Sequence, residues 1–289
     1  MKLAIYLPTA APGKRHVLRA FAEGVPRLGD EAVLVESMQR QKADLAVGYS
    51  LPGLKAKTHL RQRLLDWHGR ALVLDGGLLC PASLREAERH SRWWWGEAGQ
   101  FQVFLYDARD DSRCYGADDA PGDRLRALGY TISPWRSAGR HILLCGSMPG
   151  DLIEQGLDPA SWTATTVAAL RRLSPRPIRY RPHPGDRTRR PLPSTDWAGH
   201  EPFAAALDDA WVAVGLYSSA LARAVLAGVP AIALSPLSPA AAVAGCALTE
   251  VEAPPRPDRT AWAHALGYMQ WRPDELAAGL AWRRLKELC

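Results

Sequence analysis

The stretch DAWVAVGLYSSALARAVLAGVPAIALS, residues 209–235, indicates most directly which fold to expect. It begins with a short apolar run, which is typical of a strand buried on both faces of a sheet. After Ser218 and Ser219 comes a segment with helical spacing, 220–227, and Gly228 marks the end of that helix. A second apolar run, VPAIALS, follows at once. The stretch therefore predicts one strand–helix–strand unit of a parallel sheet.

Similar apolar runs alternate with helix-like stretches through most of the chain. Helical spacing is clear at about 16–27 and at 163–173. Such an alternation is typical of α/β proteins whose parallel sheets carry helices on both faces. The expected strands lie at 2–8, 31–37, 43–49, 71–77, 102–107, 141–147, 177–183, 209–216 and 229–235.

A loop at 132–140 divides this pattern into two series. We therefore predict two doubly wound, Rossmann-like domains over 1–135 and 136–257, followed by two helices in 258–289. Pro273, followed by Asp and Glu, marks the start of the second helix, because proline and acidic residues suit a first helical turn. A single long α/β domain is the alternative interpretation.

The bulk composition is that of a globular protein with a sizeable core, since 47% of the 289 residues are hydrophobic. The N-terminal apolar run of about five residues is too short for a signal peptide. No stretch approaches the roughly 20 apolar residues of a membrane span. The five cysteines are scattered and form no CxxC pattern, so neither a metal site nor a disulfide framework is expected. These features predict a reduced, cytoplasmic protein.

The positive charge is concentrated in one segment. The whole chain carries a net charge of +6, but residues 171–190 alone hold eight arginines against one aspartate. A concentrated basic patch predicts an anionic ligand, such as a nucleotide, a phosphate or a nucleic acid. The alternative is an arginine-rich loop that is simply solvated.

His183 lies inside this segment, directly after an expected strand. Pro182 and Pro184 restrict the backbone on both sides, so the imidazole is held rather than free, and Arg181 adds positive charge. A histidine in this place can donate a hydrogen bond to a phosphate oxygen. A histidine in an ordinary surface turn is the alternative.

Two other strand ends carry small or hydroxylated residues. Gly146 and Ser147 follow the strand expected at 141–147, and glycine lets backbone N–H groups approach a phosphate, although an ordinary tight turn has the same signal. Serines at a helix N-terminus cap it, and the same N–H groups bind anions. The residues at the second strand end are Tyr217, Ser218 and Ser219.

These motifs resemble a known class of enzymes. The His-Pro pair, followed 35 residues after His183 by Ser218 and then by AVLAGVPAI, resembles the nucleotide-binding half of GT-B glycosyltransferases. The two motifs are similar to those of bacterial sialyltransferases, Kdo transferases and CDP-glycerol polymerases. The stretches 134–151 and 265–276 also resemble phage-encoded glycosyltransferase-like proteins. The resemblance implies two Rossmann-like domains that face a cleft, with C-terminal helices that pack back on the first domain.

The resemblance also implies roles for single residues. His183, Ser218 and Ser219 would contact the phosphates of a nucleotide sugar, with a UDP-sugar as the expected donor. Asp75, in ALVLDGG, would be the general base on the acceptor hydroxyl in an inverting transfer. A turn aspartate is the alternative for Asp75, and Asp107 and Glu97 are the other candidate bases.

We expect the transfer to be independent of metal, because no suitable Asp-x-Asp motif occurs and the adjacent pairs Asp110–Asp111 and Asp208–Asp209 suit solvated or capping positions. The predicted acceptor is 5-hydroxymethylcytosine in phage double-stranded DNA, which a basic protein can track through its phosphates. A surface polysaccharide or teichoic-type polymer is the alternative acceptor. A non-catalytic nucleic-acid-binding protein is the alternative class. Three roles are open for Trp93, Trp94 and Trp95: they cover a ligand, cover the hydrophobic core or form a dimer contact. The sequence does not determine the oligomeric state.

Overall fold

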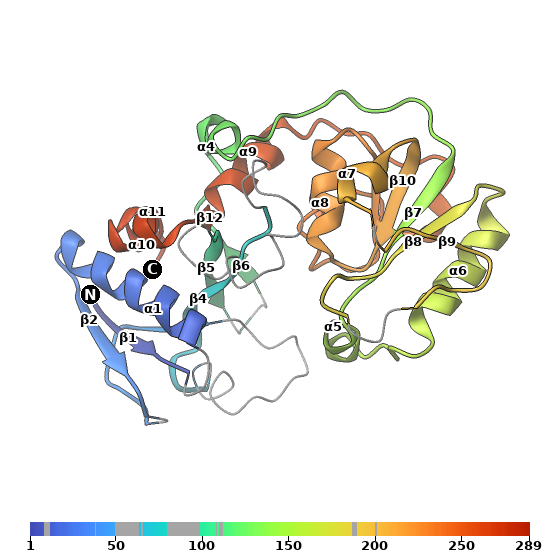
Figure 1. Ribbon diagram of the computed structural model, residues 1–289. Coiled ribbons are helices and arrows are strands. Elements are labelled where there is room, and N and C mark those ends of the chain that lie inside the picture. Colours follow the sequence, from blue (N-terminus) through green and yellow to red (C-terminus); the bar gives the residue numbers. More distant parts are fainter. Residues whose placement is uncertain are drawn as a thin grey trace. The chain divides into compact units, whose positions relative to one another are not determined.

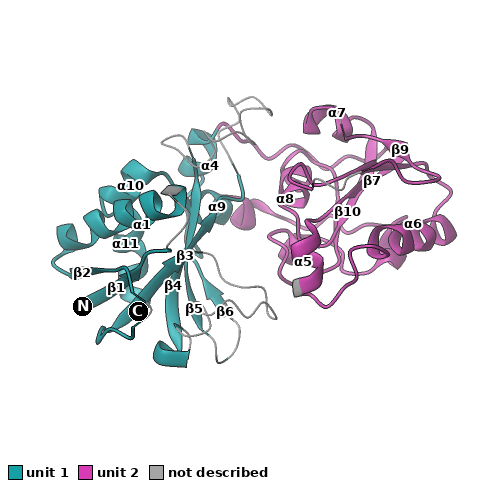
Figure 2. Ribbon diagram, turned by 60° about the horizontal axis from the view of Figure 1, so that its bottom comes forward, with its two compact units in different colours: residues 1–128, 264–289 teal, residues 129–263 magenta. Residues whose placement is uncertain are grey.

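The computed structural model describes residues 1–8, 12–37, 39–49, 64, 66–79, 99–107, 109, 112–186, 190–199 and 201–289. They divide into two compact units, Met1–Leu128 with His264–Cys289 (unit 1) and Gly129–Ala263 (unit 2), which Figure 2 colours separately. Each unit is built on a sheet with helices packed against it, so the predicted α/β class is confirmed. The domain ranges 1–135, 136–257 and 258–289 stay a prediction.

Unit 1 is built on a mixed sheet with the strand order β12-β5-β4-β3-β1-β2, in which β6 also pairs with β5. The strands from β4 to β2 run parallel, whereas β5 runs antiparallel to β4, β6 and β12. Their bounds are β1 (Lys2–Tyr6), β2 (Glu31–Val35), β3 (Leu45–Tyr49), β4 (Arg70–Gly76), β5 (Phe101–Asp107), β6 (Ser112–Cys114) and β12 (Gln270–Trp271).

The antiparallel strand β5 corrects the expectation of a purely parallel sheet. Just beyond β4, the N–H of Gly77 donates to the carbonyl of Gln100 (N···O 2.9 Å), so the antiparallel pairing of β4 with β5 continues for one residue beyond β4. The register then places Asp75 opposite Gln102 and Arg70 opposite Asp107. An apolar run contains no information on strand direction, which is why the sequence did not reveal this reversal.

One face of this sheet is covered by α1, α10 and α11 (Figure 1). Apolar side chains of α1 recur on one side of the helix, and Phe21 meets Trp282 of α11 edge to face, with ring centroids 6.3 Å apart. The helices of this unit are α1 (Pro12–Gly24), η1 (Val25–Leu28), α4 (Asp123–Ala127), α10 (Pro273–Ala277), α11 (Leu280–Leu285) and η5 (Lys286–Leu288). Helix α9 (Thr260–Tyr268) begins in unit 2 and ends in unit 1.

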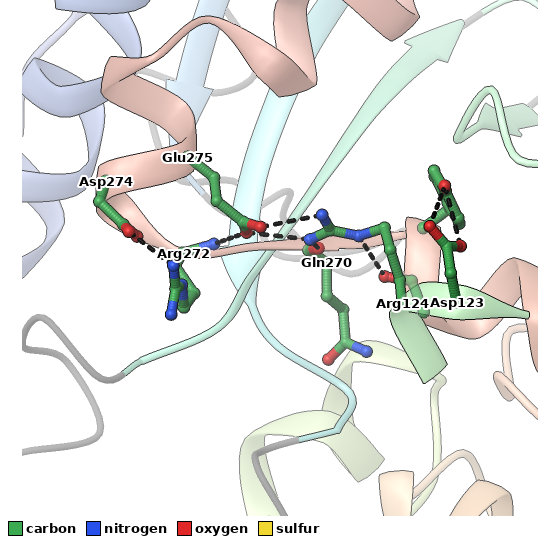
Figure 3. Close-up of polar contacts among 8 residues, drawn as sticks. Asp123, Arg124, Gln270, Arg272, Asp274 and Glu275 are labelled. Atoms are coloured by element: carbon green, nitrogen blue, oxygen red, sulfur yellow. Dashed lines mark hydrogen bonds and ion pairs between the residues drawn. The ribbon is translucent and has the colours of Figure 1, made fainter. Parts of the chain in front are cut away.

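An ion pair fixes α4 against the C-terminal segment. Figure 3 shows Arg124 of α4 meeting Glu275 of α10 in two parallel N–H···O bonds, each 2.9 Å long. Arg124 also donates to the carbonyl of Gln270 (2.8 Å) and lies over the Trp271 ring, 4.2 Å from its centroid. The guanidinium therefore joins three segments of unit 1.

The C-terminal segment departs from the two helices that the sequence predicts. α10 does begin at Pro273, as expected. Gln270 and Trp271, which precede α10, pair with β5 and form the strand β12. Gly279, with φ +78°, separates α10 from α11. The end of α1 approaches α10 closely because Gly24 has no side chain, since a Cβ there would lie only 2.0 Å from the carbonyl oxygen of Leu276.

Unit 2 is built on a fully parallel sheet with the order β11-β10-β7-β8-β9. α6 packs on one face, and α7 and α8 pack on the other. The strands are β7 (His141–Cys145), β8 (Ile178–Arg181), β9 (Asp196–Trp197), β10 (Ala210–Gly215) and β11 (Ala231–Ala233). The helices are α5 (Pro149–Glu154), α6 (Trp162–Leu173), α7 (Phe203–Leu207), α8 (Ser219–Leu226), η3 (Ala241–Val243) and η4 (Leu248–Glu250). The predicted strand–helix–strand unit over 209–235 is therefore confirmed.

Candidate active site

Three neighbouring strands of unit 2 bring the predicted donor-site residues to one edge of the sheet. In the order β10-β7-β8, the register aligns the last residues of the strands, Gly215 with Cys145 and Cys145 with Arg181. Because the strands are parallel, the segments that follow them leave the sheet at the same edge, where open α/β sheets bind ligands. These segments carry Gly146, Ser147, His183, Tyr217, Ser218 and Ser219.

Gly146 lies directly against the His183 segment. Its N–H donates to the carbonyl of Arg181 (N···O 2.8 Å). A Cβ on Gly146 would lie 3.0 Å from the Tyr180 hydroxyl oxygen and 3.2 Å from the His183 nitrogen, closer than most real side-chain carbons come. The close approach of these two loops therefore favours a glycine.

The His183 ring is held in one tautomer by its own turn. The N–H of Gly185 donates to Nδ1 (N···N 3.1 Å), and the N–H of Asp186 donates to the His183 carbonyl (3.0 Å). A nitrogen that accepts a hydrogen bond carries a lone pair, so the neutral ring has its hydrogen on Nε2. The half-buried imidazole therefore presents Nε2–H as its donor.

The serine pair begins α8. Ser218 is the N-cap residue, and its Oγ accepts the N–H of Ala220 (3.2 Å), so the predicted capping role is confirmed for Ser218. α8 has eight residues and begins at Ser219. Unsatisfied N–H groups and the helix dipole favour an anion at such a terminus.

Ser147 and Tyr217 occupy the ends of the two central strands. The Oγ of Ser147 is buried and has no hydrogen-bond partner among the described residues. A buried hydroxyl without a partner is uncommon in proteins, and a ligand is one explanation for it. Tyr217 is half-buried between β10 and the start of α8.

Most of the described arginines in the basic segment bind oxygens of the protein itself. Arg181 is buried, and its Nη1 donates to the carbonyls of Ala198 (3.1 Å) and Glu201 (2.6 Å). Three neighbours pair similarly, Arg171 with the carbonyl of Ser194, Arg176 with Glu252 and Arg179 with Glu201. A phosphate contact of Arg181 stays a prediction, but its guanidinium already binds the carbonyls of Ala198 and Glu201.

In unit 1, Asp75 lies at the carboxyl end of β4, as predicted. Its side chain is half-buried, and its Oδ1 accepts the N–H of Gly76 (2.7 Å). Asp107, the other described candidate base, lies at the opposite edge because β5 is antiparallel, and it is paired with Arg109. Glu97 lies outside the described residues, as do the three tryptophans at 93–95.

Three polar residues that the sequence did not single out surround Asp75. Gln102, directly opposite in the sheet, donates through Nε2 to the carbonyl of Gly76 (2.7 Å) and accepts from the hydroxyl of Tyr115 (2.9 Å). Tyr49 ends the neighbouring strand β3, and burial, together with the negative charge of Asp75, raises the pKa of its hydroxyl. A polar residue at the start of the apolar run FQVFLYD was the signal available for Gln102.

A positive charge also lies at this edge of unit 1. The ammonium of Lys14, in the first turns of α1, is 5.0 Å from the centroid of the Tyr49 ring. Within the described ranges, His, Cys, Asp and Glu side chains form no group of three that could hold a metal ion. Where the structure describes helices, none is long and apolar enough to cross a membrane.

Sequence comparison gives no relative for this chain. No family model matches it, and no curated protein matches it.

Comparison of folds does give similar structures. The Thermosulfurimonas dismutans KpsC β-Kdo 2,4 transferase aligns with 92% of this chain and 90% of its own, at 15% identity and a TM-score of 0.54. The KpsC β-Kdo 2,7 transferase of the same organism aligns with a TM-score of 0.45 at 13% identity, over 81% of this chain and 78% of its own. The Methanocaldococcus jannaschii UDP-GlcNAc 2-epimerase, solved with UDP-GlcNAc and UDP, gives 0.32 at 11% identity, over 81% and 84%. The first similarity shows a shared fold, and the predicted GT-B class of α/β units with parallel strands is therefore confirmed.

Proposed function

We propose that this protein is a glycosyltransferase that moves a sugar from a nucleotide sugar to an acceptor hydroxyl. The observation that carries the proposal is the meeting of three strand ends, which gathers Gly146, His183 and Ser218 at one edge of the unit 2 sheet. A shared fold with a Kdo transferase supports it.

In this proposal the donor's phosphates bind at the unit 2 edge. His183 donates from Nε2–H, and Ser218, Ser219 and the N-terminus of α8 supply further donors. These groups stabilise the negative charge that grows on the leaving phosphate oxygen as its bond to the sugar breaks. A UDP-sugar is the donor that we propose.

Asp75 acts on the acceptor. It takes the proton from the acceptor hydroxyl, whose oxygen forms the new bond to the anomeric carbon while the nucleotide leaves from the other side. The configuration of the sugar is then inverted.

For the acceptor we propose a hydroxyl of a glycan. Four arginines of the basic segment bind protein oxygens, which reduces the charge available to track the phosphates of DNA. The similar T. dismutans protein is named a Kdo transferase, and Kdo is a sugar. Hydroxymethylcytosine in duplex DNA is the second candidate, favoured by the net charge of +6.

Calorimetry with UDP, GDP and CMP and their sugars tests the donor site. We expect one nucleotide to bind, and His183→Ala to weaken its binding about tenfold, the value of one charge-assisted hydrogen bond. His16→Ala, at an exposed position on α1 in unit 1, is the control and keeps the wild-type affinity. Equal affinities of the two variants would remove His183 from the donor site.

Transfer assays with the bound donor then identify the acceptor. Oligosaccharides and hydroxymethylcytosine-containing duplex DNA are incubated separately, and mass spectrometry reads the product. A gain of one sugar mass on an oligosaccharide supports the proposed acceptor, and a gain on DNA nucleosides supports the second candidate. If no nucleotide binds, the glycosyltransferase proposal is wrong.

A further inference from the structure

We propose that Gln102 and Tyr115 are positioning residues that hold Asp75 in place for the transfer. This inference rests on the proposed function and adds residues that the resemblance does not supply. It is carried by a chain of hydrogen bonds that crosses three strands of unit 1 and ends at the peptide next to Asp75.

The three side chains belong to one face of the sheet. Asp75 of β4 is directly opposite Gln102 of β5, and two residues further along the strands Val73 is opposite Phe104. The ring of Tyr115, just after β6, packs on Phe104 with centroids 5.0 Å apart. Side chains two residues apart on a strand share a face, so Gln102 lies between Asp75 and Tyr115.

The orientation of the Gln102 amide is fixed by its two partners. Its NH₂ group must face the carbonyl of Gly76, because two carbonyl oxygens cannot form a hydrogen bond with each other. Its oxygen then faces the Tyr115 hydroxyl, which donates (2.9 Å). Burial, with a further contribution from the charge of Asp75, raises the pKa of Tyr115 to about 12, so the hydroxyl keeps its proton at neutral pH.

The chain acts on Asp75 through Gly76. Gln102 binds the carbonyl of Gly76, and the N–H of the same residue donates to Asp75 Oδ1 (2.7 Å). Gly76, opposite Phe101 at the end of β4, has no side chain to restrict its backbone, so the Gln102 contact adds to the strand pairing that holds it. With Gly76 fixed, the carboxylate of Asp75 has a fixed direction, which a general base requires.

Three variants and one control test the inference. Tyr115→Phe removes one hydroxyl and keeps the ring on Phe104, and Gln102→Ala removes the whole link. Gln102→Glu keeps an acceptor for Tyr115 but places a second carboxylate opposite Asp75. The control is Tyr106→Phe, a buried tyrosine on the same face of β5.

We expect kcat to fall about tenfold in Tyr115→Phe and about a hundredfold in Gln102→Ala, since small misplacements of a base are costly. In these two variants the KM for the donor and the affinity for the donor keep their wild-type values. In Gln102→Glu the acidic limb of the kcat profile moves to higher pH by about one unit, because a like charge disfavours the ionised base. Tyr106→Phe keeps the wild-type kcat.

A loss of melting temperature without a change in kcat or in the pH profile would show a merely structural role and overturn the inference. Loss of transfer in Asp75→Asn, together with wild-type kcat in all three variants, would also overturn it and leave the proposed function intact. Absence of transfer in the wild-type protein would instead remove the proposed function itself.

Discussion

Single glycines set how closely the loops of the donor site approach. Gly146→Ala would bring a Cβ to within 3.2 Å of the His183 nitrogen, whereas a Cβ on Gly150 meets nothing within 4 Å. We expect Gly146→Ala to displace His183 and to weaken nucleotide binding about tenfold, the loss of one good hydrogen bond. Gly150→Ala, the matched control, keeps its affinity in the same calorimetric titration. Equal nucleotide affinity of Gly146→Ala and Gly150→Ala would mean that the contact between Gly146 and the His183 segment does not affect nucleotide binding.

Asp75 and Asp107 form a second matched pair, because they end neighbouring strands at opposite edges of the sheet. We expect Asp75→Asn to bind the donor normally and to lose transfer by a factor of about 10² to 10⁴, the usual contribution of a general base. Asp107→Asn, which breaks the pair with the exposed Arg109 at the opposite edge, stays active. The measurement is the initial rate of sugar transfer, and loss of activity in Asp107→Asn alone would reverse the assignment.

For single residues, the sequence predicted where a residue lies in the fold better than it predicted which groups that residue contacts. His183, Ser218 and Gly146 could be placed at strand ends because prolines, serines and glycines leave local signals. Arg181 was counted as part of a basic patch, yet its guanidinium binds the carbonyls of Ala198 and Glu201. Gln102 was visible only as a polar residue in an apolar run, and its role could not be found from the sequence, since its two partners, Gly76 and Tyr115, are distant in the chain.

Among the secondary-structure elements, the contact of α4 with α10 depends on one ion pair. Burial alone would raise the pKa of Glu275, but hydrogen bonds from Arg124 and from the Arg272 backbone lower it below its ordinary value. We expect Glu275→Gln to reduce the free energy of unfolding by about 2 kcal/mol at neutral pH, since both side chains are largely buried. Asp274→Asn, in an exposed pair with Arg272, changes it by less than about 0.5 kcal/mol.

The same pair gives a pH dependence with a definite sign. The folded-state pKa of Glu275 lies below the unfolded one, so its stabilisation is complete above the unfolded value of about 4.3 and is lost as the pH falls through the folded value. Urea unfolding of the wild type and of Glu275→Gln should therefore converge in acid. If the difference in the free energy of unfolding between the wild type and Glu275→Gln stays constant down to the lowest pH, the charge of Glu275 is not what stabilises the contact.

For the elements, periodicity predicted the helices at 163–173 and 220–227 and most strands within a few residues. It missed the direction of β5 and the two-residue strand β12, because both depend on pairing between distant parts of the chain. Gly279 was read as part of one helix, but its positive φ ends α10, and its missing side chain, like that of Gly24, allows α1 to approach closely.

Considered as a whole, the molecule has two units with separate cores, and each carries part of the proposed chemistry. The proposed donor residues all belong to unit 2, and Asp75 with its proposed positioning residues belongs to unit 1. A nucleotide should therefore affect the two units differently. We expect a ligand to order the loops at the unit 2 edge, whereas the peptide after Asp75 already receives a hydrogen bond from Gln102.

Hydrogen exchange read by mass spectrometry, with and without UDP-, GDP- and CMP-sugars, tests this central claim most directly. We predict slower exchange of backbone amides in 146–148, 183–186 and 217–221 with one of the donors, and less slowing in these segments for His183→Ala at a donor concentration equal to the wild-type Kd. Protection that is absent from all three segments with every donor, or that appears only in unit 1, would contradict it.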